Sequence, residues 1–204
     1  MLITGIRSKP VYAPLQPDLQ GRYHLMVGQG VGAAPLSRLL GQLQQASSSA
    51  MARTRVLYLE EAAQDASLQA QWRAFGVSDV RLFAQQQSLL ADLRAVLDAS
   101  LMGTRLYVAG PESFIGLVMR VALDFNLNKD EIRAEECGSG ARRVHCIHCR
   151  SVSENVKTNI VRCVGCERWL VVRDHYSRRL AAYMGVMVDA EAPGELPPLK
   201  EMFP

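Results

Sequence analysis

Four cysteines arranged as two Cys-x-x-Cys turns are the residues whose types and spacing most strongly indicate chemistry in this sequence. Cys146 and Cys149 form the first turn, and Cys163 and Cys166 form the second. Such a turn directs two thiolates at one ion about 2.3 Å away, and two turns complete the tetrahedron that Zn²⁺ accepts. The 13 residues between the turns are slightly fewer than the usual ribbon spacing of about 15–20. This spacing favours a short two-stranded hairpin between the turns.

Two disulfides, or four unrelated buried thiols, are the alternatives to a metal site. The N-terminal residues lack a basic segment followed by an apolar core, so the sequence indicates the cytoplasm and not an oxidising compartment. Structural zinc is therefore the default, although iron in a rubredoxin-like site uses the same ligands. His145 and His148 flank the first turn, and either could replace a cysteine, but we expect them outside the ligand set. Cys137 is expected to be a free thiol.

Composition predicts a globular protein with room for one ordinary domain and a small second one. The chain has 204 residues, of which 49% are hydrophobic, enough to bury a core. No apolar run approaches the roughly 18–20 residues that a membrane span needs. The overall charge of +3 is unevenly distributed: residues 137–181 carry nine Lys/Arg and three Asp/Glu, whereas residues 1–136 carry 13 of each kind. The cysteine region is therefore basic and the rest is neutral.

Strand-like apolar runs alternate with helix-like ones from residue 23 onward, which predicts a parallel sheet wrapped by helices. We expect an α/β fold with five parallel strands and helices on both faces, followed by a small zinc ribbon. The expected strands are 23–27, 54–59, 80–83, 105–109 and 131–134, the last at an edge. The expected helices lie at about 36–43, 66–75, 89–97 and 114–125, with a surface loop at 46–50.

The expected domain organisation places this sheet domain at residues 23–136. An extended arm precedes it at 1–22, where three prolines interrupt any helical period. The ribbon, with a short helix at about 176–184, occupies 141–184 after a flexible linker. An extended tail covers 185–204, and we expect it to dock on a partner.

Glycines follow the first and fourth expected strands, where ends of parallel strands place ligands. Gly28, Gly30 and Gly32 end the first strand, and Gly110 and Pro111 follow the fourth. A backbone without Cβ lets a pyrophosphate approach the start of a helix. A tight turn that feeds a helix is the alternative explanation. These five residues are the candidate nucleotide crevice.

Residues 23–136 resemble the nucleotide half of the ferredoxin–NADP reductase family. Ala34-Pro35 stands where that family has Thr-Pro, and Ala109 stands where it has the Cys of a Cys-Gly-Pro turn. The flavin-binding barrel of the family has no room upstream. Glu60 and Glu61 follow the second strand, where carboxylates could accept the hydroxyls of an NAD ribose but would repel a 2′-phosphate.

The C-terminal region resembles one family more closely, through two runs that flank the second cysteine turn. These runs are Asn155-Val156-Lys157-Thr158-Asn159-Ile160-Val161 and Arg173-Asp174-His175-Tyr176-Ser177-Arg178-Arg179 with the residues up to Val186. They are similar to the small zinc-ribbon subunit of bacterial dimethylamine monooxygenase. The resemblance implies an accessory subunit of a haem-dependent complex that uses O₂ and NADPH to convert dimethylamine to methylamine and formaldehyde. Haem, FMN, the [2Fe–2S] cluster and NADPH would then belong to a haem subunit and a flavin/iron–sulfur reductase subunit.

Two other functions remain open at the level of the sequence. A nucleic-acid-binding zinc ribbon would explain the local basic charge and the aromatic residues among the arginines. The neutral first domain argues against it. A nicotinamide-nucleotide-binding reductase component would explain the glycines, but the missing flavin barrel argues against it. His175 beside Asp174 could suggest a general base, yet no nucleophile or open metal position accompanies the pair, so we predict no catalytic residue in this chain.

Overall fold

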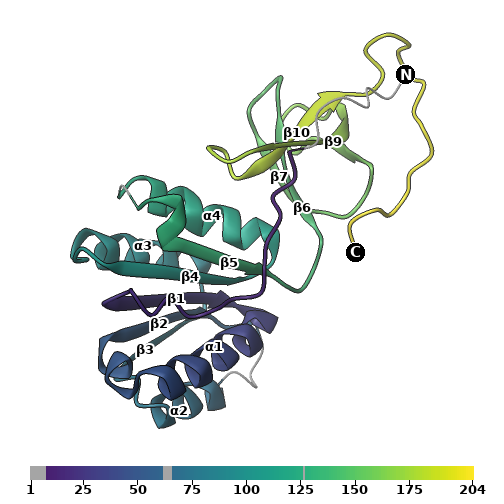
Figure 1. The fold of residues 1–204 in the computed structure, drawn as a ribbon. Helices are drawn as coiled ribbons and strands as arrows, with labels where there is room; N and C mark the ends of the chain where they lie inside the picture. The colour runs from purple at the N-terminus through teal and green to yellow at the C-terminus, as the bar shows by residue number, and fades with distance from the viewer. Residues whose placement is uncertain (1–7, 62–65, 126) are drawn as a thin grey trace. The chain divides into compact units, whose positions relative to one another are not determined.

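The computed structural model describes residues 8–61, 66–125 and 127–204 (Figure 1). The first seven residues of the expected N-terminal arm lie outside these ranges. Contacts divide the chain into two units. Tyr12–Gly138 form the first, which we call the sheet domain. Ser139–Pro204 together with Met1–Val11 form the second, which we call the cysteine module.

The sheet domain contains the expected five-stranded parallel sheet, with strands in the order β3-β2-β1-β4-β5. Its central strand β1 pairs with β2 on one side and β4 on the other, so Val27 faces Leu57 and Val108 in register. The three central strands are almost continuously apolar because both faces of the sheet are covered. The strands are β1 (Tyr23–Gln29), β2 (Thr54–Leu59), β3 (Asp79–Phe83), β4 (Thr104–Gly110) and β5 (Ile132–Glu136).

Helices cover both faces of this sheet, as predicted (Figure 1). One buried cluster joins leucines of α1 and Trp72 of α2 to Met26, Tyr58 and Tyr107 of the strands. A second cluster joins apolar residues of α3 and α4 to the opposite face, including Val27 and Val108. The helices are α1 (Ala33–Ala46), α2 (Ala66–Ala74), α3 (Gln86–Asp98) and α4 (Glu112–Leu123), with 3₁₀ turns η1 (Gly30–Gly32), η2 (Ser48–Arg53) and η4 (Lys129–Glu131).

The predicted surface loop at residues 46–50 is correct in its exposure up to residue 49, but the structure has the 3₁₀ turn η2 from Ser48 onward. Ala50 and Met51 are buried in the core cluster next to α1. The Thr54 hydroxyl donates to the Ala50 carbonyl at 2.9 Å and holds the turn against the start of β2. The serines stay at the surface, as their polarity indicated, whereas the two apolar residues after them enter the core.

Residues of the N-terminal arm form a strap across the sheet domain. Leu15 is 1% exposed within the α1-side core. Asp18 anchors the strap: its amide donates to the Tyr107 hydroxyl at 2.9 Å, and its carboxylate accepts from Arg105 at 2.8 Å and Arg133 at 3.3 Å. Burial alone would raise the pKa of Asp18, but hydrogen bonds from Arg105, from the Gln20 amide and from Arg133 outweigh it and the pKa is lowered. The arm therefore docks on this chain.

The cysteine module contains a second five-stranded sheet, in the order β7-β6-β10-β9-β8. The expected two-stranded hairpin is thus wrong, since each cysteine turn closes a hairpin of its own within a larger sheet. A small core of Val144, Val156, Val172, Tyr176 and Tyr183 supports it. The strands are β6 (Arg142–Cys146), β7 (Val152–Val156), β8 (Ile160–Arg162), β9 (Trp169–Ser177) and β10 (Ala182–Met187).

The predicted helix at about 176–184 is wrong, because the end of β9 and the start of β10 form an antiparallel hairpin there. Tyr176 and Tyr183 face each other across the two strands, with ring centroids 5.0 Å apart. Ala181 has a left-handed backbone (φ 49°) that turns the chain. The apolar spacing was compatible with one helical turn, but pairing of β10 with both β6 and β9 overrides so short a pattern.

The end of the C-terminal tail docks on the module itself, and docking of the tail on a partner stays a prediction. The expected tail also starts too early, since β10 continues to Met187. The amides of Met202 and Phe203 donate to the Lys157 carbonyl at 2.8 and 2.9 Å. The guanidinium of Arg142 lies between two rings, 4.0 Å from the Tyr183 centroid and 3.8 Å from that of Phe203. These contacts close the end of the module opposite the cysteine turns.

Candidate metal centre and nucleotide crevice

The two cysteine turns have the same backbone hydrogen bonds. In each turn, the amide of the first cysteine donates to the carbonyl of the residue five positions later, at 2.9 Å in both turns. The amide of the residue four positions later donates to the carbonyl of that first cysteine, at 2.9 Å for Cys146 and 3.1 Å for Cys163. The residue after each turn, Arg150 or Glu167, has a left-handed backbone (φ 66° and 60°). The turns are therefore two copies of one knuckle, each at the end of a hairpin.

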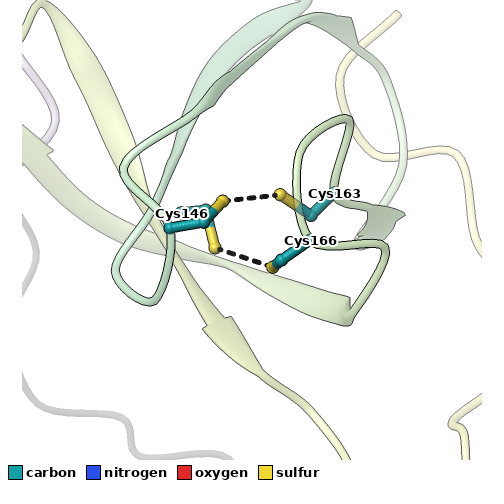
Figure 2. A group of neighbouring side chains, drawn as sticks. Cys146, Cys163 and Cys166 are labelled. Atoms are coloured by element: carbon teal, nitrogen blue, oxygen red, sulfur yellow. Dashed lines mark hydrogen bonds between the residues drawn. The ribbon is translucent and has the colours of Figure 1, made fainter.

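The four sulfur atoms converge between the knuckles and lie within 4.8 Å of one another. Cys146 Sγ lies 3.7 Å from Cys166 Sγ, and Cys149 Sγ lies 3.5 Å from Cys163 Sγ. Figure 2 shows the side chains of Cys146, Cys163 and Cys166 pointing toward one another. Tetrahedral bonds of 2.3 Å require sulfurs about 3.8 Å apart, so the cluster fits a four-coordinate metal ion. All four cysteines are free thiols, which contradicts the disulfide alternative.

Burial and hydrogen bonding shift the pKa values of three of the thiols in different directions. Burial raises the pKa of Cys146, which has no exposed surface, to about 11. Hydrogen bonds from the side chain and amide of Ser151 lower the pKa of Cys149 to about 6. The amide and guanidinium of Arg168 lower the pKa of Cys166. A bound cation would hold all four groups as thiolates, so binding would release protons.

Gly165 is required by the closeness of the two knuckles. A Cβ at this position would overlap the hydroxyl of Ser151 and lie 3.0 Å from Cys149 Sγ. The Gly165 amide donates to Cys163 Sγ at 3.4 Å, as amides commonly do to metal-bound thiolates. A side chain at residue 165 would therefore separate the two pairs of sulfurs.

The flanking histidines and the fifth cysteine stay outside this cluster. His148 Nε2 accepts a hydrogen bond from the Met187 amide at 3.3 Å, which commits that nitrogen to the backbone. Cys137 belongs to the sheet domain, where its amide donates to the Gly110 carbonyl at 2.9 Å. Within the described ranges, no other group of three or more His, Cys, Asp or Glu side chains is placed to hold a metal.

The glycine-rich turns lie together at the position where the sheet changes direction. β1 and β4 are adjacent although they are not consecutive, and Gly28 pairs with Ala109. Open α/β sheets bind ligands outside the carboxyl ends of two such strands. The structure therefore brings the predicted crevice residues to the correct edge, and their neighbours decide whether a nucleotide fits.

Packing inside the protein accounts for Gly28 and Gly32. A Cβ on Gly28 would lie 2.6 Å from the side chain of Leu36 in α1. A Cβ on Gly32 would overlap the carbonyl group of Ala109 at the end of β4. Both glycines let α1 approach the sheet closely. This packing agrees with the alternative explanation of the glycines, a tight turn that leads into a helix.

Glu61 occupies the space above Gly30, where a pyrophosphate would approach. Gly30 has φ +53°, and a Cβ there would overlap the Glu61 carboxylate. Gln29 Nε2 donates to Glu61 Oε1 at 2.6 Å, and the Tyr58 hydroxyl donates to the Gly30 carbonyl at 2.5 Å. From the sequence, Glu61 was a candidate acceptor for the hydroxyls of a ribose. In the structure its negative charge lies on the glycine turn itself and would repel a phosphate.

The other side of the crevice is covered by the chain that leaves β5. Cys137 binds the Gly110 carbonyl, and Gly138 packs so closely that a Cβ on it would lie 3.1 Å from Val31 and 3.6 Å from Pro111. The Gly110 and Pro111 turn is thus in contact with protein.

None of the helices in the described ranges is long and apolar enough to span a membrane.

Comparisons with solved structures return oxidoreductases with low identity. Phthalate dioxygenase reductase, a modular protein for electron transfer from pyridine nucleotides to [2Fe–2S], is 18% identical with a TM-score of 0.46, over 69% of this chain and 46% of that chain. An intact type IV self-sufficient cytochrome P450 monooxygenase is 15% identical with a TM-score of 0.48, over 85% of this chain and 22% of that one.

Sequence comparisons are more specific. A curated relative, the heme-dependent oxidative N-demethylase delta subunit of Ectopseudomonas mendocina (strain ymp), is 36% identical over 108 residues, which cover 51% of this chain and 62% of that protein. The family model of the N-terminal domain of dimethylamine monooxygenase subunit DmmA-like proteins matches residues 4–132, and that of their C-terminal domain matches residues 143–186. These matches include both the sheet and the four cysteines, and the chain belongs to the DmmA-like family of dimethylamine monooxygenase subunits.

Proposed function

We propose that this chain is an accessory subunit of a cytoplasmic, haem-dependent monooxygenase that demethylates dimethylamine to methylamine and formaldehyde. Membership of the DmmA-like family and the likeness to an N-demethylase delta subunit support this assignment. The chain aligns with only 62% of that relative, so its substrate and partners are part of the proposal. A haem subunit and a flavin/iron–sulfur reductase subunit are the partners, and they hold haem, FMN, the [2Fe–2S] cluster and NADPH.

The observation that carries the accessory role is the Glu61 carboxylate on the Gly30 turn. An electron-donating subunit with this sheet would take its reductant at the carboxyl ends of β1 and β4. Here that position is filled by the chain's own carboxylate and by the residues after β5. The sheet therefore acts as a scaffold, and NADPH binds to another subunit.

Structural Zn²⁺ is the metal we assign to Cys146, Cys149, Cys163 and Cys166. Four thiolates complete a tetrahedral coordination sphere, which leaves no open position for a substrate or water. When bound, the ion supplies folding energy to a module with a small core. The cysteine module is then a rigid element for assembly, and the electron path lies in the other subunits.

Calorimetry with the isolated chain tests the absence of nucleotide binding. We expect no heat with NADPH or NADH at about 1 mM, the concentration range of a very weak site. A Glu61→Ala variant removes the carboxylate and should gain weak binding of inorganic pyrophosphate. A Glu60→Ala variant is the matched control and should not. Nucleotide binding by the wild-type chain would refute the accessory assignment in favour of a reductase component.

Co-purification tests the partners. The chain should purify with a haem-containing protein when it is expressed with its genomic neighbours, and the absorption spectrum of the complex should contain both haem and flavin bands. Metal analysis of the isolated chain should give about one zinc and no haem. Isolation of a lone chain that binds DNA would instead support the nucleic-acid alternative.

A further inference from the structure

The hairpin of β9 and β10 carries positive charge that no residue in the described ranges compensates. Arg173, Arg178 and Arg179 lie within seven residues, and His175 lies between them. No described residue forms a hydrogen bond, ion pair or ring contact with these four side chains. Residues 178 and 179 are exposed at the turn of the hairpin, and residue 175 is exposed on β9.

Apart from the exposed Arg150, the other arginines of the module are engaged within the protein, which makes this group distinct. Arg143 binds Glu154 at 2.9 Å, and Arg162 binds Glu167 at 2.8 Å. Most arginines of the sheet domain are paired in the same way: Arg38 with Glu135, Arg55 with Asp79, Arg81 with Asp79 and Asp92, Arg94 with Asp124, Arg105 with Asp18 and Glu131, and Arg133 with Asp18. Among the described residues, three arginines without an ion pair lie within seven positions at this hairpin, whereas others, such as Arg22, Arg53 and Arg73, are scattered along the chain.

The carboxylate in the middle of this group does not neutralise it. Asp174 pairs with the buried Arg142 at 2.8 Å. Neighbouring residues of a strand point to opposite faces, so Arg173 and His175 project away from the side on which Asp174 and Tyr176 lie. β10 contains no acidic residue. One face and the turn of the hairpin are therefore cationic, over a distance of about 13 Å from residue 173 to residue 177 at the usual rise per residue.

The backbone of the hairpin is closed to strand addition at this place. The Ser8 amide donates to the Asp174 carbonyl at 3.0 Å, and the Tyr176 amide donates to the Ser8 hydroxyl at 2.7 Å. The N-terminal arm thus covers the exposed edge of β9, as edge strands commonly require. Recognition here depends on side chains, and the available groups are guanidinium forks that bind carboxylates in bidentate fashion.

We propose that Arg173, His175, Arg178 and Arg179 form a docking surface, the cationic hairpin, for a carboxylate-rich face of a partner protein subunit. The inference rests on the proposed function, since it names the surface by which this subunit joins the complex. Nucleic acid fits less well: Tyr176 and Tyr183 are 7% and 1% exposed, so they cannot stack on bases. Binding of single-stranded nucleic acid without sequence preference also needs a positively charged groove longer than one hairpin. Charge complementarity sets partner choice and association rate.

Affinity of charge-neutral variants for the rest of the complex tests the cationic hairpin. The full chain is immobilised, and binding of the purified remaining subunits is measured by interferometry at low and physiological salt. A triple Arg173→Gln, Arg178→Gln, Arg179→Gln variant should lose about tenfold or more in affinity, mainly through slower association, and its salt dependence should flatten.

The matched control removes the same charge elsewhere. Arg22, Arg53 and Arg73 are exposed and have no ion pair among the described residues. Replacing all three by Gln should change affinity by less than about twofold, the usual effect of scattered surface charges. Unchanged zinc content and an unchanged circular dichroism spectrum show that both triple variants are folded. An Arg178→Glu, Arg179→Glu variant should bind more weakly than the neutral variant.

The outcomes separate the two proposals. If the unmodified chain binds the remaining subunits and the Arg173→Gln, Arg178→Gln, Arg179→Gln variant binds them with the same affinity, the docking surface is overturned. The proposed function is then left intact. Failure of the wild-type chain to bind any haem-containing subunit overturns the proposed function and with it the docking surface. Salt-sensitive capture of RNA or DNA by the hairpin, in place of protein, also overturns the inference.

Discussion

Replacement of Cys163 by serine should unfold the cysteine module while the sheet domain remains folded. The Cys163 side chain is 2% exposed and lies 3.5 Å from Cys149 Sγ. Serine is a shorter and harder ligand that cannot reach the position of the sulfur. The site would then lose its fourth ligand at its buried side, where no water can easily replace it.

The magnitude follows from the small core of the module. Among the residues that the structure describes, the sheet domain has two clusters of fifteen buried residues each, whereas the main core of the module has five. Structural zinc in small domains contributes on the order of 10 kcal/mol, comparable to the whole stability of a typical domain. Loss of the ion should therefore exceed what the small core can offset, and we expect metal content to fall from about one to near zero per chain.

Two tryptophans allow each unit to be followed separately. Trp72 is buried in the sheet domain and donates from Nε1 to Ser37 Oγ at 2.8 Å. Trp169 begins β9 beside the second knuckle. In a Trp169→Phe background, the urea midpoint reported by Trp72 should not change with Cys163→Ser, whereas amide exchange in β6 to β10 should become fast. Cys137→Ser is the control and should keep its metal. Wild-type zinc content in Cys163→Ser, or a metal-free module with slow exchange, would refute the reasoning.

Three further substitutions test the packing of the two units. Gly32→Ala should destabilise the sheet domain by about 1–3 kcal/mol through overlap with the end of β4. Gly41→Ala in α1 would bring its Cβ to 3.8 Å from the Phe75 ring, an ordinary contact, and should stabilise the domain by up to about 1 kcal/mol. Opposite shifts of the urea midpoint would verify this. Asp18→Asn should cost about 2 kcal/mol at pH 7. Because the folded pKa of Asp18 is lowered, its contribution is present above its unfolded pKa near 4 and is lost as pH falls through the folded value. The gap between wild type and Asp18→Asn should thus close in acid, while Asp130→Asn shows no such gap. Arg142→Ala should remove the contacts with two rings, and faster amide exchange in residues 202–203 would report release of the tail.

The sheet domain was predictable because its signals are local and repeated. Buried strands flanked by helices on both faces read as apolar runs, and the five runs gave the correct strands within a few residues. The hairpin at 176–184 was not predictable in the same way. Its few apolar residues fit both the helical and the strand periodicity. The strand forms because β10 pairs with β6, which is more than 30 residues away in the chain. The strap and the tail also depend on distant partners, such as the Asp18 to Arg105 contact.

The metal ligands were identifiable from spacing alone because four thiolates at two Cys-x-x-Cys turns have few structural alternatives in a reduced protein. The sequence did not indicate that each turn closes a separate hairpin. The geometry adds a reason for Gly165, whose missing side chain allows the second knuckle to approach Ser151. A Cys-x-x-Cys pattern thus predicts ligands, while the sheet around it follows from pairing that the pattern does not contain.

The glycine turn after β1 illustrates why such a motif cannot separate nucleotide binding from packing. Close approach of α1 to the sheet needs residues without Cβ, and close approach of a pyrophosphate needs the same residues. The deciding group lies outside the motif: Glu61 follows the adjacent strand β2 by two residues and places its carboxylate on Gly30. In sheets of this kind, an acidic residue just beyond the second strand can bind the ribose or occupy the phosphate position, depending on whether the loop directs it outward or back over the first turn. The side chain of Gln29, which donates to Glu61 at 2.6 Å, holds it over the turn here. A neutral residue at position 61 would therefore be the change most able to return anion binding to this fold.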